Sequence, residues 1–171
     1  MPSPRIYPLY LGRITRTIAA FCHSAAPGKV GDLPLIGWYI EGSDKKILVD
    51  TGGGDPSLAT ERWLPYRREN DQSIENALRK IGVQCDDIDI VIATHLHWDH
   101  TGCNSLFSHA KIIVQERELS YARRPEAIGS CLPGVLDLDY TVISGDTDIA
   151  EGEGYIDPRP HSRIARGVGR S

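Results

Sequence analysis

Three histidines and one aspartate stand within six positions of this 171-residue chain, as His95, His97, Asp99 and His100 of the segment THLHWDHTG. Neutral imidazole and carboxylate groups are the usual protein ligands of zinc and of other divalent transition metals. A lone histidine usually has an ordinary structural role, but four potential ligands directly after an apolar segment favour a metal site. A catalytic zinc usually takes three protein ligands and keeps one position open, so four donors this close together favour two metals.

The spacing of these residues indicates how the chain would present them. His95 and His97 are two apart at the end of an expected strand, so their side chains share one face in extended backbone, and Asp99 has the same parity. His100 does not, so the backbone must turn there, and residues 101–102 suit a turn. We therefore predict that His95 and His97 bind one metal and that Asp99 and His100 bind the second, with a water or hydroxide between the two.

The elements that must position this segment alternate between strand and helix. Runs of β-branched and apolar residues predict strands over residues 45–52, 88–97, 111–115 and 140–144. Residues 73–82 have the apolar spacing of an amphipathic helix, and residues 116–124 predict a second helix that a proline closes. Strand–helix–strand order predicts an α/β layered domain, and 171 residues suffice for one domain rather than two.

Composition and charge narrow the class of protein. Apolar residues make up 40% of the chain and charged residues 25%, as in soluble globular proteins. The net charge of −4 provides no attraction to nucleic acid or to an anionic membrane, and no apolar run approaches the roughly 20 residues that span a bilayer. The N-terminus lacks the hydrophobic segment of a secretory signal, so we expect a cytoplasmic protein. The cysteines form no C-x-x-C pair and are expected to be free thiols: Cys22, Cys85, Cys103 and Cys131.

Several other residues that could bind a ligand are expected to have structural roles instead. Trp98 is expected to pack rather than to bind, and His23 and His109 have no neighbouring ligands in the sequence. The glycines at residues 52–54 are not followed by the Lys-Ser/Thr of a phosphate-binding loop. They therefore predict a tight turn.

The motif resembles that of the metallo-β-lactamase-fold hydrolases, whose H-x-H-x-D-H pattern is matched by His95, His97, Asp99 and His100. The strand-end VDTG of that fold is also matched, and the resemblance implies that Asp50 within it supports the metal loop by hydrogen bonding.

Within the fold, the chain is most similar to the N-acyl homoserine lactonases. PGKVGDLPLIGWYIEGSDKKILVDTG resembles their N-terminal hairpin region, and HLHWDHTGCN resembles their metal loop. KIIVQERELSYA and YTVISGDTDIAEG follow in the same order and at similar spacing. The resemblance covers residues from about 5 to about 152.

The resemblance implies a metallo-β-lactamase αββα sandwich, of which this chain supplies the N-terminal half only. It implies a hydrolase that opens the lactone ring of N-acyl homoserine lactones and so degrades a quorum signal. The implied cofactor is two Zn²⁺ per complete site, with other divalent transition metals as alternatives, and a hydroxide held by both metals would attack the carbonyl carbon. Asp99 would pass a proton to the leaving alkoxide. The expected partner is a small-molecule lactone or ester, with no nucleic acid and no membrane.

The resemblance ends near residue 152, so we expect residues 1–152 to form the N-terminal part of a metallo-β-lactamase-like domain and residues 153–171 to be an aberrant basic tail. The family continues with a loop that reads TPGHTPGSHG, which residues 157–166, DPRPHSRIAR, do not match, so His161 is not assigned as a ligand. Codons compatible with those ten residues, read one nucleotide later, permit TPGHTPGSHG. We therefore expect an out-of-frame tail, which the nucleotide sequence from codon 145 onward would check.

A first half alone would expose one face of the sheet and an unpaired edge, which favours self-association through the exposed sheet. It would also hold only some of the usual metal ligands. Three outcomes therefore stay open: an impaired lactonase, another hydrolase of this fold acting on thioesters, β-lactams or phosphodiesters, or a non-catalytic truncated product that binds metal weakly.

Overall fold

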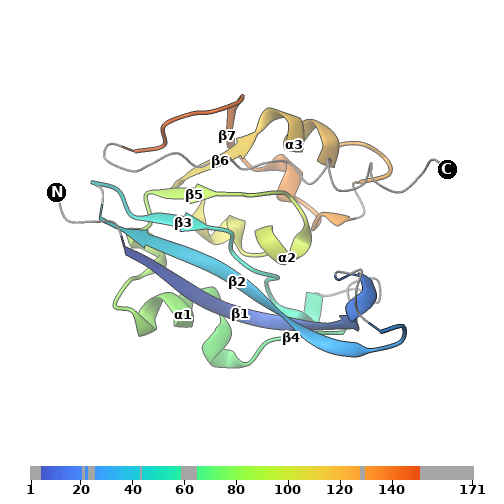
Figure 1. Cartoon of the computed structure of the whole chain (residues 1–171). Helices are drawn as coiled ribbons and strands as arrows, with labels where there is room; N and C mark the ends of the chain where they lie inside the picture. The colour runs from blue at the N-terminus through green and yellow to red at the C-terminus, as the bar shows by residue number, and fades with distance from the viewer. Residues whose placement is uncertain are drawn as a thin grey trace.

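The computed structural model describes residues 5–20, 22, 26–42, 44–58, 65–127 and 130–150, which form a seven-stranded mixed sheet with helices packed against it (Figure 1). The strands are β1 (Arg5–Thr17), β2 (Val30–Glu41), β3 (Ile47–Val49), β4 (Tyr66–Arg67), β5 (Ile90–Ile92), β6 (Lys111–Gln115) and β7 (Tyr140–Ile143). The α-helices are α1 (Ile74–Lys80), α2 (Trp98–Thr101) and α3 (Glu116–Ala122). Among the helices of these residues, none combines the length and the apolar character that a bilayer crossing requires.

The strand order β4-β1-β2-β3-β5-β6-β7 divides the sheet into two parts. Strands β1, β2 and β3 pair antiparallel, whereas β3, β5, β6 and β7 run parallel to one another. The carboxyl ends of β3 and β5 therefore meet at the same edge of the sheet, and α2 lies at that edge (Figure 1). In open α/β sheets this is the edge at which ligands usually bind.

The predicted α/β class is confirmed, and each predicted strand and helix is present, β6 with the predicted bounds and the others with shorter ones. The strand predicted over residues 88–97 ends at Ile92 as β5. The N–H of Ala93 still donates to Ile113 O on β6 (2.9 Å), but the N–H of Thr94 turns away and donates to the side chain of Asp50 (2.9 Å). The backbone thus leaves the sheet just before the first histidine of the motif.

Periodicity did not predict β1, β2 or β4, and β1 is the longest of these strands. β1 pairs with β2 from Arg5↔Glu41 to Thr17↔Val30, with a register shift between Tyr10 and Arg13. Its sequence, RIYPLYLGRITRT, contains a proline and a glycine, both of which weaken a strand pattern. Pairing along the length of β2 overrides this local preference. The antiparallel pairing of β2 with β3 agrees with the hairpin that the family resemblance implied.

Helices α1 and α3 cover the same face of the sheet. Side chains of α1 and of α3 pack there against alternate residues of the strands, in two adjoining clusters that include Leu48, Val91 and Val114. The serine at the start of α1, Ser73, accepts a hydrogen bond from Asn76 N–H, as a capping serine should. This helical face forms the main core.

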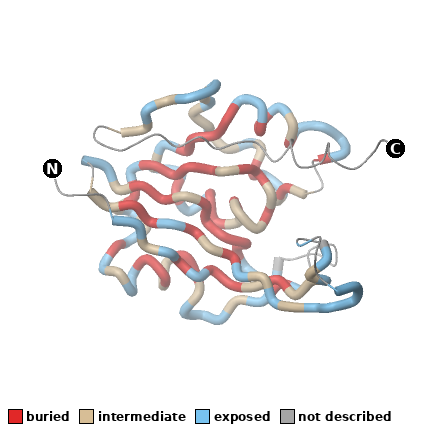
Figure 2. The backbone as a smooth tube through the Cα atoms, viewed as in Figure 1, coloured by how far each residue is buried: buried red, intermediate tan, exposed pale blue. Residues whose placement is uncertain are grey.

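The opposite face of the sheet is only partly exposed. Over the parallel strands and the adjoining part of β2 it carries a buried isoleucine cluster: Ile40, Ile47, Ile90, Ile92 and Ile113. Over β1 and β2 it exposes Ile6 (62% exposed), Tyr10 (41%) and Trp38 (42%), so exposed apolar side chains of this face lie on these two strands. Figure 2 shows exposed stretches along both strands. Self-association through this surface stays a prediction.

Candidate metal centre

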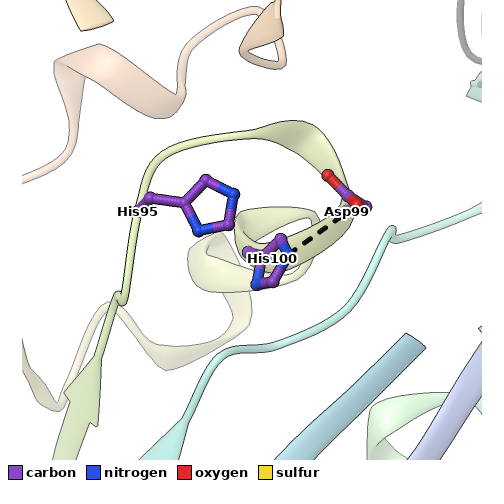
Figure 3. A group of neighbouring side chains, drawn as sticks. All are labelled: His95, Asp99 and His100. Atoms are coloured by element: carbon purple, nitrogen blue, oxygen red, sulfur yellow. Dashed lines mark ion pairs between the residues drawn. The ribbon is translucent and has the colours of Figure 1, made fainter. Parts of the chain in front are cut away.

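The histidine segment turns earlier than its spacing predicted. The prediction that extended backbone continues through Asp99 was wrong, because α2 begins at Trp98 and contains both Asp99 and His100. The carbonyl of His97 starts this helical turn by accepting hydrogen bonds from the N–H groups of His100 and Thr101, each at 3.1 Å. Asp99 therefore reaches the site from a helix, and His95 reaches it from the loop after β5 (Figure 3).

Three of the four predicted ligands lie together. His95, Asp99 and His100 each offer a ligand atom, and these atoms lie within 4.8 Å of one another. The rings of His95 and His100 are 3.9 Å apart between centroids, and His100 Nε2 lies 3.7 Å from Asp99 Oδ2 (Figure 3). His97 is outside this group, although its ring centroid is 4.7 Å from that of His95. The four residues are thus neighbours, and the tightest grouping combines His95 with Asp99 and His100.

A buried carboxylate, Asp50, connects β3 to this segment. Asp50 directly follows Val49, the last residue of β3, and only 5% of Asp50 is exposed. Its Oδ1 accepts from Thr94 N–H (2.9 Å), and its Oδ2 accepts from the Thr94 hydroxyl (2.7 Å) and lies 2.7 Å from His100 Nδ1. The backbone of Asp50 has a φ of +58°, a left-handed conformation that aspartate tolerates better than most residues.

These hydrogen bonds assign the tautomers of two imidazoles. Nδ1 of His100 donates to Asp50, which leaves Nε2 as the nitrogen that can face a cation. The Thr94 hydroxyl gives its one proton to Asp50, so its 3.2 Å contact with His95 Nδ1 requires the ring N–H to donate. Nε2 of His95 is then also free of a proton. A single carboxylate thus orients both rings, directly at His100 and through Thr94 at His95, in the way that metal-binding histidines are usually oriented.

Substituting Thr94 with valine tests this relay. Valine keeps the shape of threonine but has no hydroxyl, so Nδ1 of His95 loses its acceptor, and the tautomer is no longer fixed. We expect zinc affinity to fall about tenfold, the lower end of the usual cost of losing such a supporting group. Isothermal titration of the metal-free protein with zinc would measure it, and Thr94→Ser should bind as the unmodified chain does. Equal affinity in the valine variant would show that the relay is unimportant.

Opposing effects set the protonation of His100. Burial of the ring, the largest effect, lowers the pKa of His100, but the hydrogen bond to Asp50 and the negative charges of Asp50, Asp99 and Glu118 raise it by more. The pKa of His100 therefore lies above its ordinary value in the metal-free chain. A cation that binds this ring must displace a proton, so binding at this position weakens as the pH falls.

The glycine loop after β3 packs backbone to backbone against the end of α2. Gly102 N–H donates to Gly52 O (2.7 Å), and Thr51 N–H donates to His100 O (2.7 Å). Gly52 and Gly54 have φ values of +75° and +73°, which confirms the predicted tight turn. The Thr51 hydroxyl adds a hydrogen bond to Asn104 Oδ1 (2.8 Å) and accepts one from Cys103 N–H (3.1 Å). These contacts fix the position of α2, and no local sequence signal other than the glycines points to them.

The remaining candidates have structural roles. Trp98 packs in the core edge-on to Tyr66, as predicted, and His109 lies on the surface near Phe107. None of the four cysteines forms a disulfide. Burial raises the pKa of the Cys103 thiol to about 11, so Cys103 is not a thiolate, and it is not part of the ligand group. His23, His161 and the predicted tail over residues 153–171 lie outside the described residues.

The donor set fits a divalent cation. It combines imidazole nitrogens with a carboxylate, the ligands that zinc prefers, in a partly buried cluster. Two ligand atoms on one tetrahedral zinc are about 3.4 Å apart, given metal–ligand bonds of about 2.1 Å. The 3.7 Å between His100 Nε2 and Asp99 Oδ2 is close to that spacing. The carboxylate that fixes the imidazoles from behind is also a regular feature of metal-binding histidines.

A family model and sequence relatives agree on the family to which the chain is similar. A family model described as the metallo-beta-lactamase superfamily matches residues 37–170. N-acyl homoserine lactonase AiiA of Bacillus thuringiensis subsp. kurstaki is 31% identical over 163 residues, which cover 89% of this chain and 64% of that protein. N-acyl homoserine lactonase AiiB of Agrobacterium fabrum is 33% identical over 106 residues, which cover 57% of this chain and 38% of that protein. The chain thus spans about 64% of the length of the curated AiiA.

The similarity extends to solved structures. A crystal structure of a point mutant of B. thuringiensis AiiA, with N-decanoyl-L-homoserine bound at the active site, has a TM-score of 0.73 and 28% identity. A second structure, of an N-acyl homoserine lactone hydrolase with N-hexanoyl-L-homoserine at its catalytic metal centre, gives the same values. Each match covers 86% of this chain and 62% of the solved chain.

Proposed function

This chain belongs to the metallo-beta-lactamase superfamily, and on that basis we propose that the protein is a metal-dependent hydrolase that opens the lactone ring of N-acyl homoserine lactones. One observation carries the proposal. His95, Asp99 and His100 form a partly buried ligand group, which Asp50 orients, in a chain similar to N-acyl homoserine lactonases. Hydrolysis of such lactones would degrade a quorum signal.

The proposed cofactor is zinc, two ions per complete site, with His95 and His97 on one ion and Asp99 and His100 on the other. A divalent cation bound there supplies a Lewis acid that activates water and polarises a carbonyl near neutral pH. Other divalent transition metals with a similar preference for nitrogen and oxygen ligands are alternatives. Two observations support adjacent cation positions. The ligand atoms of His95, Asp99 and His100 lie within 4.8 Å of one another, and the ring centroid of His97 is 4.7 Å from that of His95.

Asp99 is the residue we propose for proton transfer. Its side chain is 20% exposed, beside the His100 ring but still accessible to a small molecule. Water adds to the carbonyl carbon of the lactone, and the bond from that carbon to the ring oxygen breaks. The carboxylate of Asp99 takes the proton that the attacking water loses and passes it to the ring oxygen, which leaves as an alcohol. The product is the open-chain N-acyl homoserine.

Substrate preference tests the proposal directly. The purified chain, supplied with zinc, would be assayed with N-hexanoyl homoserine lactone, lactoylglutathione, a chromogenic cephalosporin and a nitrophenyl phosphodiester. We expect ring opening of the lactone to dominate, with a metal content near two zinc ions per chain by mass spectrometry. Preferred turnover of the thioester, β-lactam or phosphodiester would assign a different hydrolase of the family. No turnover together with no bound zinc would indicate a non-catalytic protein.

Asp99→Asn tests the proton transfer. Asparagine keeps the size of aspartate and one oxygen that can act as a ligand, but it cannot carry the proton. We expect kcat for lactone opening to fall by about 100- to 10,000-fold, the usual contribution of a positioned acid or base. The exposed aspartate of a surface turn offers a matched control, since Asp86→Asn should leave kcat unchanged. A residual kcat within a factor of three of the unmodified chain would remove Asp99 from this role.

A further inference from the structure

A second buried carboxylate lies behind the histidine segment. Among the described residues, the acids with less than a tenth of their surface exposed are Asp50 and Glu118, and Glu118 is only 2% exposed. Removing a carboxylate from water costs several kcal/mol, about as much as a protein recovers by good pairing, so an uninvolved acid is rarely buried. Asp50 is accounted for by His100 and Thr94. Glu118 lies on α3, and no step proposed above uses it.

The side chain of Glu118 reaches the motif itself. Its Oε1 accepts a hydrogen bond from Leu96 N–H at 3.0 Å, and Leu96 is the residue between His95 and His97. Leu96 is fully buried, so its N–H has no access to solvent. A buried N–H that loses its acceptor costs about 1–3 kcal/mol, so this hydrogen bond favours a single path for the backbone at this point.

The packing around Leu96 holds the same two elements together. Its side chain lies in a cluster with Leu119 and Ala122 of α3 and with Val114 of β6. Leu119 is adjacent to Glu118, so α3 contacts the histidine segment by both an apolar and a polar group. The apolar contact alone could not select the direction of the Leu96 peptide, whereas a hydrogen bond to its N–H does so.

We propose that Glu118 is a positioning residue of the metal centre: from α3, its carboxylate holds the His95-Leu96-His97 segment in the orientation that binds a divalent cation. The inference rests on the proposed function only in taking His95 and His97 as ligands. In this arrangement two buried carboxylates act on the motif from different elements, Asp50 from the end of β3 and Glu118 from α3. The fixed negative charge of Glu118 also favours a cation nearby, as a carboxylate behind metal-binding histidines generally does.

Two substitutions separate the hydrogen bond from the charge. Glu118→Gln keeps an oxygen that can accept from Leu96 N–H but removes the charge, and Glu118→Asp keeps the charge but shortens the side chain so that it no longer reaches. Glu116 lies on the same helix and is exposed, so Glu116→Gln is the matched control. Each variant would be titrated with zinc by calorimetry, and its melting temperature would be measured in the presence of a chelator. The absorption spectrum after loading with cobalt would report the geometry of the ligands.

We expect Glu118→Asp to bind zinc 10- to 100-fold more weakly and to change the cobalt spectrum, because the hydrogen bond to Leu96 is lost. Glu118→Gln should keep the cobalt spectrum and lose less zinc affinity, because only the charge is lost, and Glu116→Gln should bind as the unmodified chain does. If the Glu118 variants melt at lower temperature but keep the zinc affinity and cobalt spectrum of the unmodified chain, Glu118 is only structural and the inference is wrong. If the unmodified chain itself takes up no zinc or cobalt, the metal site of the proposed function fails, and the inference fails with it. The unmodified chain therefore distinguishes the two failures.

Discussion

Replacing Asp50 with alanine is expected to weaken zinc binding by up to about 100-fold and to destabilise the metal-free fold. The substitution removes the acceptor of three groups, Thr94 N–H, the Thr94 hydroxyl and Nδ1 of His100. Each buried donor left without a partner costs about 1–3 kcal/mol, which exceeds what is regained by no longer burying a carboxylate with its partners in place. Both imidazoles also lose their fixed tautomers, which accounts for the loss of metal affinity.

Two further substitutions separate the carboxylate from the backbone at Asp50. Alanine is strained at a φ of +58°, whereas glycine is not and asparagine tolerates it, so Asp50→Gly and Asp50→Asn remove the carboxylate with little added backbone strain. We expect both to lose zinc affinity nearly as far as Asp50→Ala, measured by calorimetry, and to melt above it. If Asp50→Gly or Asp50→Asn binds zinc as tightly as the unmodified chain, the effect of alanine is a backbone effect and the assigned role of the carboxylate is wrong.

Gly102→Ala is expected to destabilise the fold by more than about 4 kcal/mol, a cost seen only when a substitution breaks a tightly packed feature. A Cβ at this position would overlap Gly53 C and Gly54 N and would lie 2.6 Å from Gly52 O. All three atoms are backbone, so no side chain can rotate away, and the loop after β3 must separate from α2. Urea denaturation would measure the loss, and zinc titration should show that the ligand group is lost with it.

Gly82→Ala is the matched control for this substitution. Gly82 has a φ of +77° but no atom near its would-be Cβ, so alanine there costs only the left-handed conformation, about 1–2 kcal/mol. Gly102 has an ordinary helical φ of −60°, so its cost arises from the contact alone. If Gly102→Ala loses no more stability than Gly82→Ala, the loop and α2 are not held as closely as described.

The part of the site that could be predicted from sequence is the part that is contiguous. A metal site could be predicted because four potential ligands lie within six positions of the sequence: His95, His97, Asp99 and His100. The flanking strands could be predicted from runs of β-branched residues. The helical turn at Trp98 was not predicted. It depends on hydrogen bonds to the carbonyl of His97, and the alternation of side chains along an extended chain gives no information about such bonds.

The supporting contacts were not predictable, because they join residues far apart in the chain. Thr94 meets Asp50 across 44 positions, and Leu96 meets Glu118 across 22. Nothing in the local pattern around Glu118 distinguishes it from the exposed acid two residues earlier on the same helix. The first strand was missed for a related reason, since its pairing with β2 outweighs a proline that would argue against a strand.

The shared carboxylate at the end of β3 has a thermodynamic consequence. Because Asp50 anchors one imidazole directly and the other through the Thr94 hydroxyl, the positions of both rings depend on the same carboxylate oxygen, Oδ2. The free energies of placing them are coupled, so losses measured at His95 and at His100 should not add. The affinity of the centre for a cation is therefore a property of the hydrogen-bonded network as a whole and cannot be assigned to individual side chains.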